Sequence, residues 1–288
     1  MRSKKIKRRK KCKINFTVFL FAIIFVAVLL ILFLSKHKKN KVYYYDKKVF
    51  EKPKKIKNIQ KEFRIPIVMY HYVEYVKDPG DTIRKSLNIV PFVLEKEFEE
   101  LNKNNYRTLF VKEIPRIISG EMPYSSRSAT LTFDDGYEDF YTDVFPLLKK
   151  YKIKATVYVV YNFIDRKGFL NEKEIQEIID SGLVEIGAHT LDHYYLKQSS
   201  ELVATKQIID NKKMLENRFK IQIETFAYPY GAFDQDTIDM VKLAGYTTAV
   251  SVIPGIKHSK DDLFYLYRIR AGSFSYENMI KYFESSKI

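Results

Sequence analysis

The chain has 288 residues, of which 50 are Lys or Arg and 35 are Asp or Glu, so its net charge is +15. Hydrophobic residues make up 46% of the sequence, which is enough for a packed core and excludes a wholly disordered chain. The single cysteine, Cys12, excludes an intrachain disulfide.

The excess of positive charge is confined to the N-terminal part of the chain. Residues 1–62 hold 20 Lys/Arg and 3 Asp/Glu, whereas residues 63–288 hold 30 and 32, a net charge of −2. A domain that binds a phosphate backbone carries a net positive charge. We therefore expect no nucleic-acid partner.

An uncharged run of 21 residues, from Ile14 to Leu34, predicts a single membrane-spanning helix. At ~1.5 Å per residue, its length of about 31 Å matches the hydrocarbon core of a bilayer. Nine Lys/Arg precede the run, so residues 1–13 are expected to form a basic cytoplasmic tail. A cleaved signal peptide is the alternative, although no small-residue cleavage site follows the run. Residues 35–62 would then be a basic tether, and residues 63–288 an extracellular domain at the cell membrane.

From Phe63 onward, short apolar runs alternate with amphipathic stretches. This alternation predicts an α/β fold with a parallel sheet, curled into a distorted or incomplete (β/α) barrel of about seven strands. In such folds, functional side chains collect at the C-terminal ends of the strands. The expected strands are 65–70, 129–133, 155–160, 184–188, 224–228, 247–252 and 266–270, and the expected helices are 94–104, 139–151, 172–181, 201–218 and 235–243.

Two of these helices have clear end signals. Asn171 and Glu174 fit an N-cap and its reciprocal partner, and Gly182 follows the same helix. Asp234 is expected to cap the last predicted helix, and Gly245 to end it.

Two adjacent carboxylates, Asp134 and Asp135, follow the strand predicted at 129–133, in the segment TFDDG. Like charges in a partly dry cleft repel, and a bound cation removes that cost. Because side chains alternate along an extended chain, one carboxylate could bind a metal while the other acts as a base. The alternative is an ordinary turn, which Asp-Asp-Gly also favours.

His189 and His193 follow the strand predicted at 184–188, in the segment HTLDH. Their spacing predicts that they lie on one face of a helical turn, which suits two imidazoles on one metal ion. With Asp135 they would form a two-His, one-carboxylate site that keeps positions open for water and substrate. Non-haem iron oxygenases use the same ligand set, but the α/β alternation and the Asp pair fit them poorly. Without a carboxylate partner, two surface histidines would be the alternative.

Two further segments lie at predicted strand ends. In FAYPYG (226–231) a sharp turn exposes the backbone N–H of Tyr230, which could bind a developing oxyanion, and Tyr228 and Pro229 belong to the same candidate substrate-binding turn. His71 ends the first strand of the domain, in MYHY. An ordinary loop and a structural histidine are the respective alternatives.

Taken together, TFDDG and HTLDH resemble the motifs of the polysaccharide deacetylase family, which shares a domain with the rhizobial nodulation chitooligosaccharide deacetylases. The resemblance covers most of residues 63–288. IPIVMYHYV and FAYPYG look most like the biofilm branch, which deacetylates poly-β-1,6-N-acetylglucosamine and carries its catalytic histidine at the start of the domain.

The resemblance implies a role for each matching residue. Asp135, His189 and His193 would hold a divalent metal, with Zn²⁺ as the first choice and Co²⁺ or Ni²⁺ as alternatives. Asp134 would be the general base, and His71 would be the general acid that protonates the leaving amine.

The resemblance also implies that the amide of Tyr230 stabilises the oxyanion. Many relatives carry an arginine, which orients the base, just before the Pro-Tyr-Gly turn, but Ala227 stands there in this chain. Arg268 or Arg270 could take its place. A C-terminal Leu-x-His is missing as well, and His258 is a weaker candidate acid than His71 because it lies in a charged, looping stretch.

We therefore expect a metal-dependent hydrolase that removes N-acetyl groups from an extracellular amino-sugar polymer, poly-β-1,6-N-acetyl-D-glucosamine, and releases acetate. The alternatives are a peptidoglycan N-acetylglucosamine deacetylase and an inactive glycan-binding module of the same fold. An anchored, outward-facing domain suits a polymer that is being exported or built into the wall, so a polysaccharide synthase or export machinery is a candidate partner.

Overall fold

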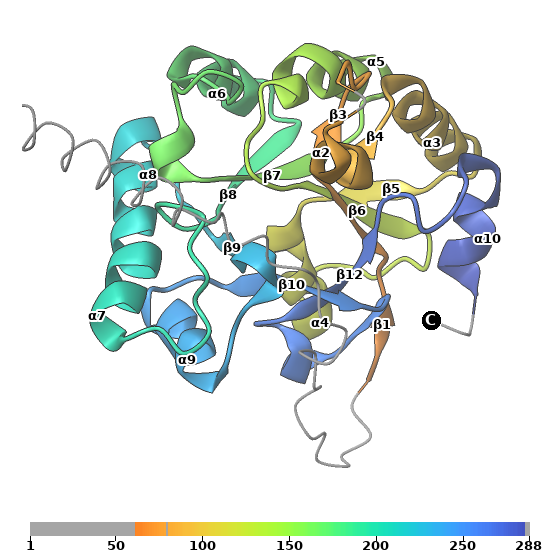
Figure 1. Ribbon diagram of the computed structural model, residues 1–288. Helices are drawn as coiled ribbons and strands as arrows, with labels where there is room; N and C mark the ends of the chain where they lie inside the picture. The colour runs from red at the N-terminus through yellow and green to blue at the C-terminus, as the bar shows by residue number, and fades with distance from the viewer. Residues whose placement is uncertain (1–60, 79, 286–288) are drawn as a thin grey trace, which may run out of the picture. The chain divides into compact units, whose positions relative to one another are not determined.

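The computed structural model describes residues 61–78 and 80–285, which belong to one compact unit, Ile56–Ile288 (Figure 1). The predicted tail and membrane-spanning helix (1–34), and nearly all of the tether (35–62), lie outside the described residues. Within the described part, no helix is both long enough and apolar enough to cross a bilayer.

Seven parallel strands lie side by side in a sheet that closes on itself (Figure 1). They coincide with the seven predicted strands, with small differences at the ends, so the predicted (β/α) barrel is confirmed. Around the ring the strands are β2 (Ile67–Tyr70), β12 (Leu266–Arg270), β10 (Thr248–Pro254), β9 (Thr225–Ala227), β8 (Val184–Ala188), β7 (Ala155–Val159) and β6 (Ser128–Phe133).

The pairing of β2 with β6 closes the ring, and Tyr70 lies opposite Phe133 in its register. The barrel is therefore closed rather than incomplete. A further strand, β5 (Arg107–Leu109), pairs with the N-terminal half of β6. The sequence did not indicate β5, because three residues are too few to show a pattern.

The two faces of the strands are buried in different cores, since side chains alternate along a strand. Val68 belongs to the large core between the barrel and its helices, whereas Ile67, Tyr158 and Leu266 belong to a separate apolar cluster. Gly187 of β8 makes room for the second cluster, because a Cβ at this position would lie 2.4 Å from the ring of Tyr158. Burial on both faces explains why the strands read as continuous apolar runs.

Helices cover the outside of the ring (Figure 1). Short helices at 82–87, 114–119 and 279–284 were not predicted, because six residues hold too few turns for a periodic pattern. In chain order the described α-helices are α2 (Thr82–Leu87), α3 (Pro91–Lys103), α4 (Ile114–Ser119), α5 (Phe145–Tyr151), α6 (Glu172–Asp180), α7 (Glu201–Ala204), α8 (Asn211–Phe219), α9 (Gln235–Leu243) and α10 (Met279–Glu284).

The predicted helix caps are confirmed. The Asn171 side chain accepts from the Glu174 N–H at 3.0 Å, and the Glu174 carboxylate accepts from the Asn171 N–H at 2.9 Å, which makes a reciprocal cap for α6. Asp234 caps α9 by accepting from the Thr237 N–H at 3.0 Å.

Two stretches predicted as single α-helices contain a π-helical segment instead. Phe140–Val144 precedes α5, and Thr205–Asp210 joins α7 to α8. A π turn accommodates an additional residue and often occurs near functional sites. The second segment carries Gln207, which reaches the site described below.

The chain just ahead of β2 is held by β1 (Phe63–Arg64), which pairs antiparallel with β11 (Lys257–His258). The His258 ring is fully buried, with Nε2 2.9 Å from the carbonyl oxygen of Ile65. Burial lowers the pKa of His258 to about 4, so the neutral ring donates its Nε2–H to that carbonyl. His258 therefore has a structural position at the N-terminal end of the barrel strands.

A buried carboxyl between β2 and α3 makes the stability of the fold depend on pH. Glu97 is fully buried and accepts from the Tyr70 hydroxyl at 2.7 Å. Burial raises the pKa of Glu97 to about 7, although the Tyr70 hydrogen bond opposes the shift. The folded chain thus binds a proton that the unfolded chain releases near pH ~4.3. The stabilisation that comes from keeping Glu97 protonated in the folded chain is fully present below that pH. It is lost as the pH rises through about 7.

The Glu97→Gln substitution keeps the shape of the side chain and removes its titration. Between pH 5 and pH 8, the unfolding free energy of the unsubstituted protein should therefore fall by on the order of 2–3 kcal/mol relative to the variant. Urea denaturation of both proteins at the two pH values measures the difference. Glu185 and Asp139, whose pKa values burial also raises to about 7, titrate in both proteins and cancel. Parallel pH profiles would contradict the prediction.

Candidate active site

Three potential metal ligands converge at the C-terminal ends of two strands. Asp135 follows β6, and His189 and His193 follow β8. The Asp135 Oδ1 lies 3.3 Å from the His189 Nε2 and 3.1 Å from the His193 Nε2. One ligand atom from each residue falls within 4.8 Å of the other two, and no other described residues form such a cluster. The structure thus brings together the three residues that the sequence singled out.

The hydrogen bonding of this cluster fits a cation. The Nδ1–H of His189 donates to the Ala227 carbonyl oxygen at 2.8 Å, which leaves a lone pair on Nε2 in the neutral ring. The buried Oδ1 of Asp135 has no hydrogen-bond donor among the described groups. Electron-rich atoms therefore face one another, and a bound cation would relieve their repulsion.

The two histidines do not lie on a helical turn, so that part of the prediction is wrong. Thr190 and His193 have φ values of 65° and 54°, in the left-handed region, and the chain between the histidines forms a turn. Asp135 also has a left-handed φ, of 77°. Non-glycine residues adopt this conformation at a cost of about 1–3 kcal/mol, which the surrounding contacts must offset.

Hydrogen bonds from two neighbouring elements hold the histidine turn. The Gln207 Oε1 accepts from the N–H of Leu191 at 3.0 Å and from that of Asp192 at 3.1 Å. The Gln207 Nε2 donates to the Asp192 Oδ2 at 2.7 Å, and the Asn162 Nδ2 donates to the Asp192 Oδ1 at 2.7 Å. The turn is thereby fixed with both imidazoles directed at Asp135.

Asp134 is paired with an arginine inside the barrel. Arg268 of β12 donates from Nη1 to the Asp134 Oδ1 at 2.8 Å and from Nη2 to Oδ2 at 2.7 Å. Its remaining donors reach the Ser251 carbonyl at 2.7 Å and the Thr132 hydroxyl at 3.1 Å. Burial would raise the pKa of Asp134, but the charge and hydrogen bonds of Arg268 lower it overall. Arg270, the other candidate, donates instead to the Ser86 carbonyl at 3.1 Å.

His71 directly follows β2, which pairs with β6. Tyr70 lies opposite Phe133, and its backbone carbonyl accepts from the Asp134 N–H at 3.0 Å. His71 and Asp134 therefore follow neighbouring strands at the same height in the barrel. Burial lowers the pKa of His71, and the negative charges of Asp134 and Asp135 oppose that shift. His258, the weaker candidate acid, lies at the other end of the barrel strands.

The turn after β9 places Tyr230 beside the histidines. The Tyr230 ring centroid is 4.4 Å from that of His193. The backbone of Tyr230 has a left-handed φ of 59°. Tyr228, however, is buried and donates its hydroxyl to the Phe264 carbonyl at 2.9 Å, and Pro229 is buried as well. These two side chains therefore pack inside the domain, and the substrate-binding role of the turn stays a prediction. Gly231 is required here, since its φ is 65° and a Cβ would lie 2.2 Å from Val252.

Comparison with known proteins agrees with this geometry. A family model described as "Polysaccharide deacetylase" matches residues 121–249. YxkH of Bacillus subtilis (strain 168), which carries the same family name, is 32% identical over 215 residues, covering 73% of this chain and 72% of YxkH. The chain belongs to the polysaccharide deacetylase family.

Two further relatives of this deacetylase are informative. The poly-β-1,6-N-acetyl-D-glucosamine N-deacetylase of Staphylococcus aureus (strain MRSA252) is 28% identical over 210 residues, covering 68% of this chain and 72% of the relative. The structure of the Streptococcus pyogenes deacetylase PplD in complex with acetate has a TM-score of 0.72 and 28% identity, covering 78% of this chain and 100% of that one. The protein is thus a hydrolytic polysaccharide N-deacetylase rather than an oxygenase.

An aromatic column also flanks the deacetylase site on its β2–β6 side. The Tyr72 ring stacks on Tyr137, with centroids 3.8 Å apart, and the Arg84 guanidinium lies 4.2 Å from the same centroid. Tyr137 stacks in turn on Phe169. The sequence did not single out these rings or Gln207, because no local spacing signals a contact between distant loops.

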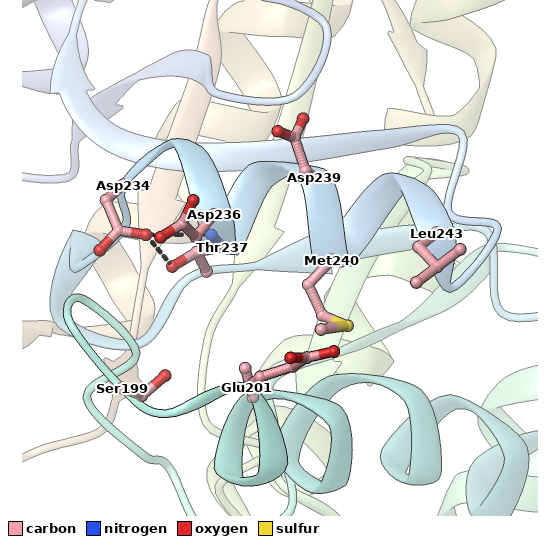
Figure 2. A pocket seen from close by; sticks show the side chains of 9 residues that line it. Ser199, Glu201, Asp234, Asp236, Thr237, Asp239, Met240 and Leu243 are labelled. Atoms are coloured by element: carbon pink, nitrogen blue, oxygen red, sulfur yellow. Dashed lines mark hydrogen bonds between the residues drawn. The ribbon is translucent and has the colours of Figure 1, made fainter.

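A separate hollow of about 350 Å³ lies between α7 and α9 of the deacetylase (Figure 2). Four carboxylates line it together with Met240 and Leu243. Asp234 accepts from the Thr237 N–H and hydroxyl and from the Gln198 N–H, so this carboxylate serves the helix cap and the adjoining loop. No histidine or cysteine is among the residues lining the hollow, and it has no evident part in the chemistry.

The Gln207→Leu variant should hold a divalent metal about tenfold more weakly than the unsubstituted protein, because the histidine turn loses its anchor. Competition with a chelator of known affinity measures the change. Gln176→Leu is the control, since Gln176 is exposed on α6 and bonds only Asp180 among described groups. Equal metal affinity in the two variants would rule out a positioning role for Gln207.

Proposed function

We propose that this deacetylase hydrolyses the N-acetyl groups of poly-β-1,6-N-acetyl-D-glucosamine at a metal site formed by Asp135, His189 and His193. The observation that carries the proposal is the convergence of three metal-binding atoms beside a second, arginine-paired carboxylate, Asp134. The named activity of the S. aureus relative supports the choice of polymer. Two imidazoles and one carboxylate suit Zn²⁺ first, with Co²⁺ and Ni²⁺ as alternatives.

The residues of the chain divide the proton transfers between them. When bound, a divalent ion lowers the pKa of water and polarises an acetamide carbonyl. Asp134, kept ionised by Arg268, takes a proton from the attacking water. His71 gives a proton to the sugar nitrogen as the C–N bond breaks, so acetate and a free amine result. The backbone N–H of Tyr230 donates to the oxyanion that develops on the carbonyl oxygen of the acetyl group.

We also propose that the domain works outside the cell, anchored by residues 14–34. The support for this comes from the sequence: an uncharged run of 21 residues follows nine Lys/Arg, a pattern that favours an outward-facing C-terminal domain. A polymer emerging from a synthase or export machinery in the same membrane would lie within reach of such a domain.

Acetate release tests the proposed substrate. Metal-loaded protein should release acetate from β-1,6-linked N-acetylglucosamine pentamer faster than from the β-1,4-linked pentamer or from peptidoglycan, and a chelator should abolish the release. Faster release from peptidoglycan would overturn the choice of polymer. Full activity after complete removal of metal would overturn the metal site.

Substitutions at the proposed base, Asp134, and at a proposed metal ligand, His193, should separate the roles of the two residues. Asp134→Asn should lower kcat by about 10²–10⁴-fold and leave the bound metal in place, because the variant loses only the proton acceptor. His193→Ala should lose metal and activity together. Metal content by atomic absorption and kcat by acetate assay give both readouts. Near-normal turnover of Asp134→Asn would show that another group is the base.

The Asp134→Asn substitution also leaves Arg268 buried without its ionic partner, which destabilises the folded protein. Thermal unfolding of Asp134→Asn is therefore measured alongside activity, at a temperature where the variant is folded. A folded, metal-loaded variant with normal kcat remains the contradicting result.

A further inference from the structure

Three exposed tyrosines border the histidine side of the site. Tyr194 and Tyr195 follow His193 directly in the chain, and Tyr230 comes from the turn after the neighbouring strand β9. Their exposed fractions are 41%, 36% and 40%, whereas most aromatic residues of the domain are buried or half-buried. Large apolar rings gathered in the open beside a reaction centre are unusual unless they contact a ligand.

Two of these rings, Tyr230 and Tyr195, continue outward from His193 of the metal-binding cluster. Tyr230 packs against His193 at 4.4 Å between centroids with an interplanar angle of 60°, and Tyr195 lies 6.3 Å from Tyr230 with an angle of 37°. The Tyr194 N–H donates to the Thr190 hydroxyl at 3.0 Å, so this residue is fixed to the same turn as the histidines. These rings are thus held at a set place relative to the reacting centre.

The aromatic rings on the opposite side of the site are less accessible. Arg84 and Tyr137 both lie within 4.2 Å of the Tyr72 ring centroid, and two groups at that distance cannot share one face of a ring. Both faces of Tyr72 are therefore covered. By contrast, the tilted contacts of Tyr230 and Tyr195 leave ring surface exposed to solvent.

We propose that Tyr195 and Tyr230 form a subsite that binds a neighbouring pyranose ring of the polymer while one sugar is deacetylated. The axial C–H groups of a β-linked hexosamine form an apolar face that stacks on an aromatic ring, and the tyrosine hydroxyls remain able to bind sugar hydroxyls. The inference rests on the proposed function for its ligand class, an N-acetylglucosamine oligomer. It makes the enzyme selective for chains over single sugars.

The test compares Tyr195→Ala with Tyr124→Ala in the metal-loaded protein. Tyr124 is exposed to a similar extent, 39%, but contacts Phe63 and Arg64 ahead of β2, away from the site. Tyr195→Ala should raise KM for the β-1,6-linked pentamer about tenfold. Its rate on a small acetyl ester, which cannot reach the subsite, should match that of Tyr124→Ala, and Tyr195→Phe should restore most of the pentamer affinity.

A binding measurement keeps the test independent of turnover. Calorimetric titration of the pentamer into chelator-treated protein should show a Kd about tenfold weaker for Tyr195→Ala than for the unsubstituted protein or Tyr124→Ala. Equal pentamer affinity in all three proteins would overturn the subsite, as would an equal loss of ester and pentamer activity in Tyr195→Ala. Pentamer binding without acetate release would instead contradict the proposed function and leave the subsite standing.

Discussion

The site depends on one electrostatic constraint: three electron-rich atoms, the Asp135 Oδ1 and the Nε2 atoms of His189 and His193, face one another in a mostly buried place. Such an arrangement is unfavourable unless a cation or a proton lies between the atoms. Burial would lower the pKa of His189, but the hydrogen bond and charge of Asp135 raise it overall. The surrounding structure enforces the arrangement nonetheless, through the Ala227 carbonyl that sets the His189 tautomer and through the Gln207 side chain that holds the turn. The left-handed backbone of Asp135 and His193, two of the three potential ligands, adds a conformational cost to this electrostatic one.

The two adjacent aspartates show how one strand end can supply two different chemistries. Asp135 turns towards the histidines, whereas Asp134 points into the barrel and meets the guanidinium of Arg268. This pairing balances the cost of burying both charges, because each carboxylate oxygen accepts a hydrogen bond. Ala227 contributes its carbonyl to His189, and the arginine that pairs with Asp134 comes from β12.

Much of this could be predicted from the sequence, and the exceptions have physical reasons. The seven barrel strands are buried on both faces, so each appears in the sequence as an apolar run. The three potential ligands could be identified because they come directly after two of these runs, at strand ends. The histidine turn was mistaken for a helical turn, because spacing alone does not reveal a left-handed residue such as Thr190. Gln207 and the choice of Arg268 over Arg270 depend on contacts between distant segments, which leave no local pattern.

The Asp134–Arg268 pair joins residues 134 positions apart in the chain, from β6 and β12. The segment matched by the family model, residues 121–249, contains Asp134 and the metal-binding cluster but ends before Arg268 and begins after His71. A fragment cut to those limits would keep Asp134 and the three potential metal ligands, but it would lose His71 and the buried partner of Asp134, Arg268. Closure of the ring by its first and last strands, β2 and β12, is thus what brings His71 and Arg268 to the strand ends that carry Asp134 and the three potential ligands.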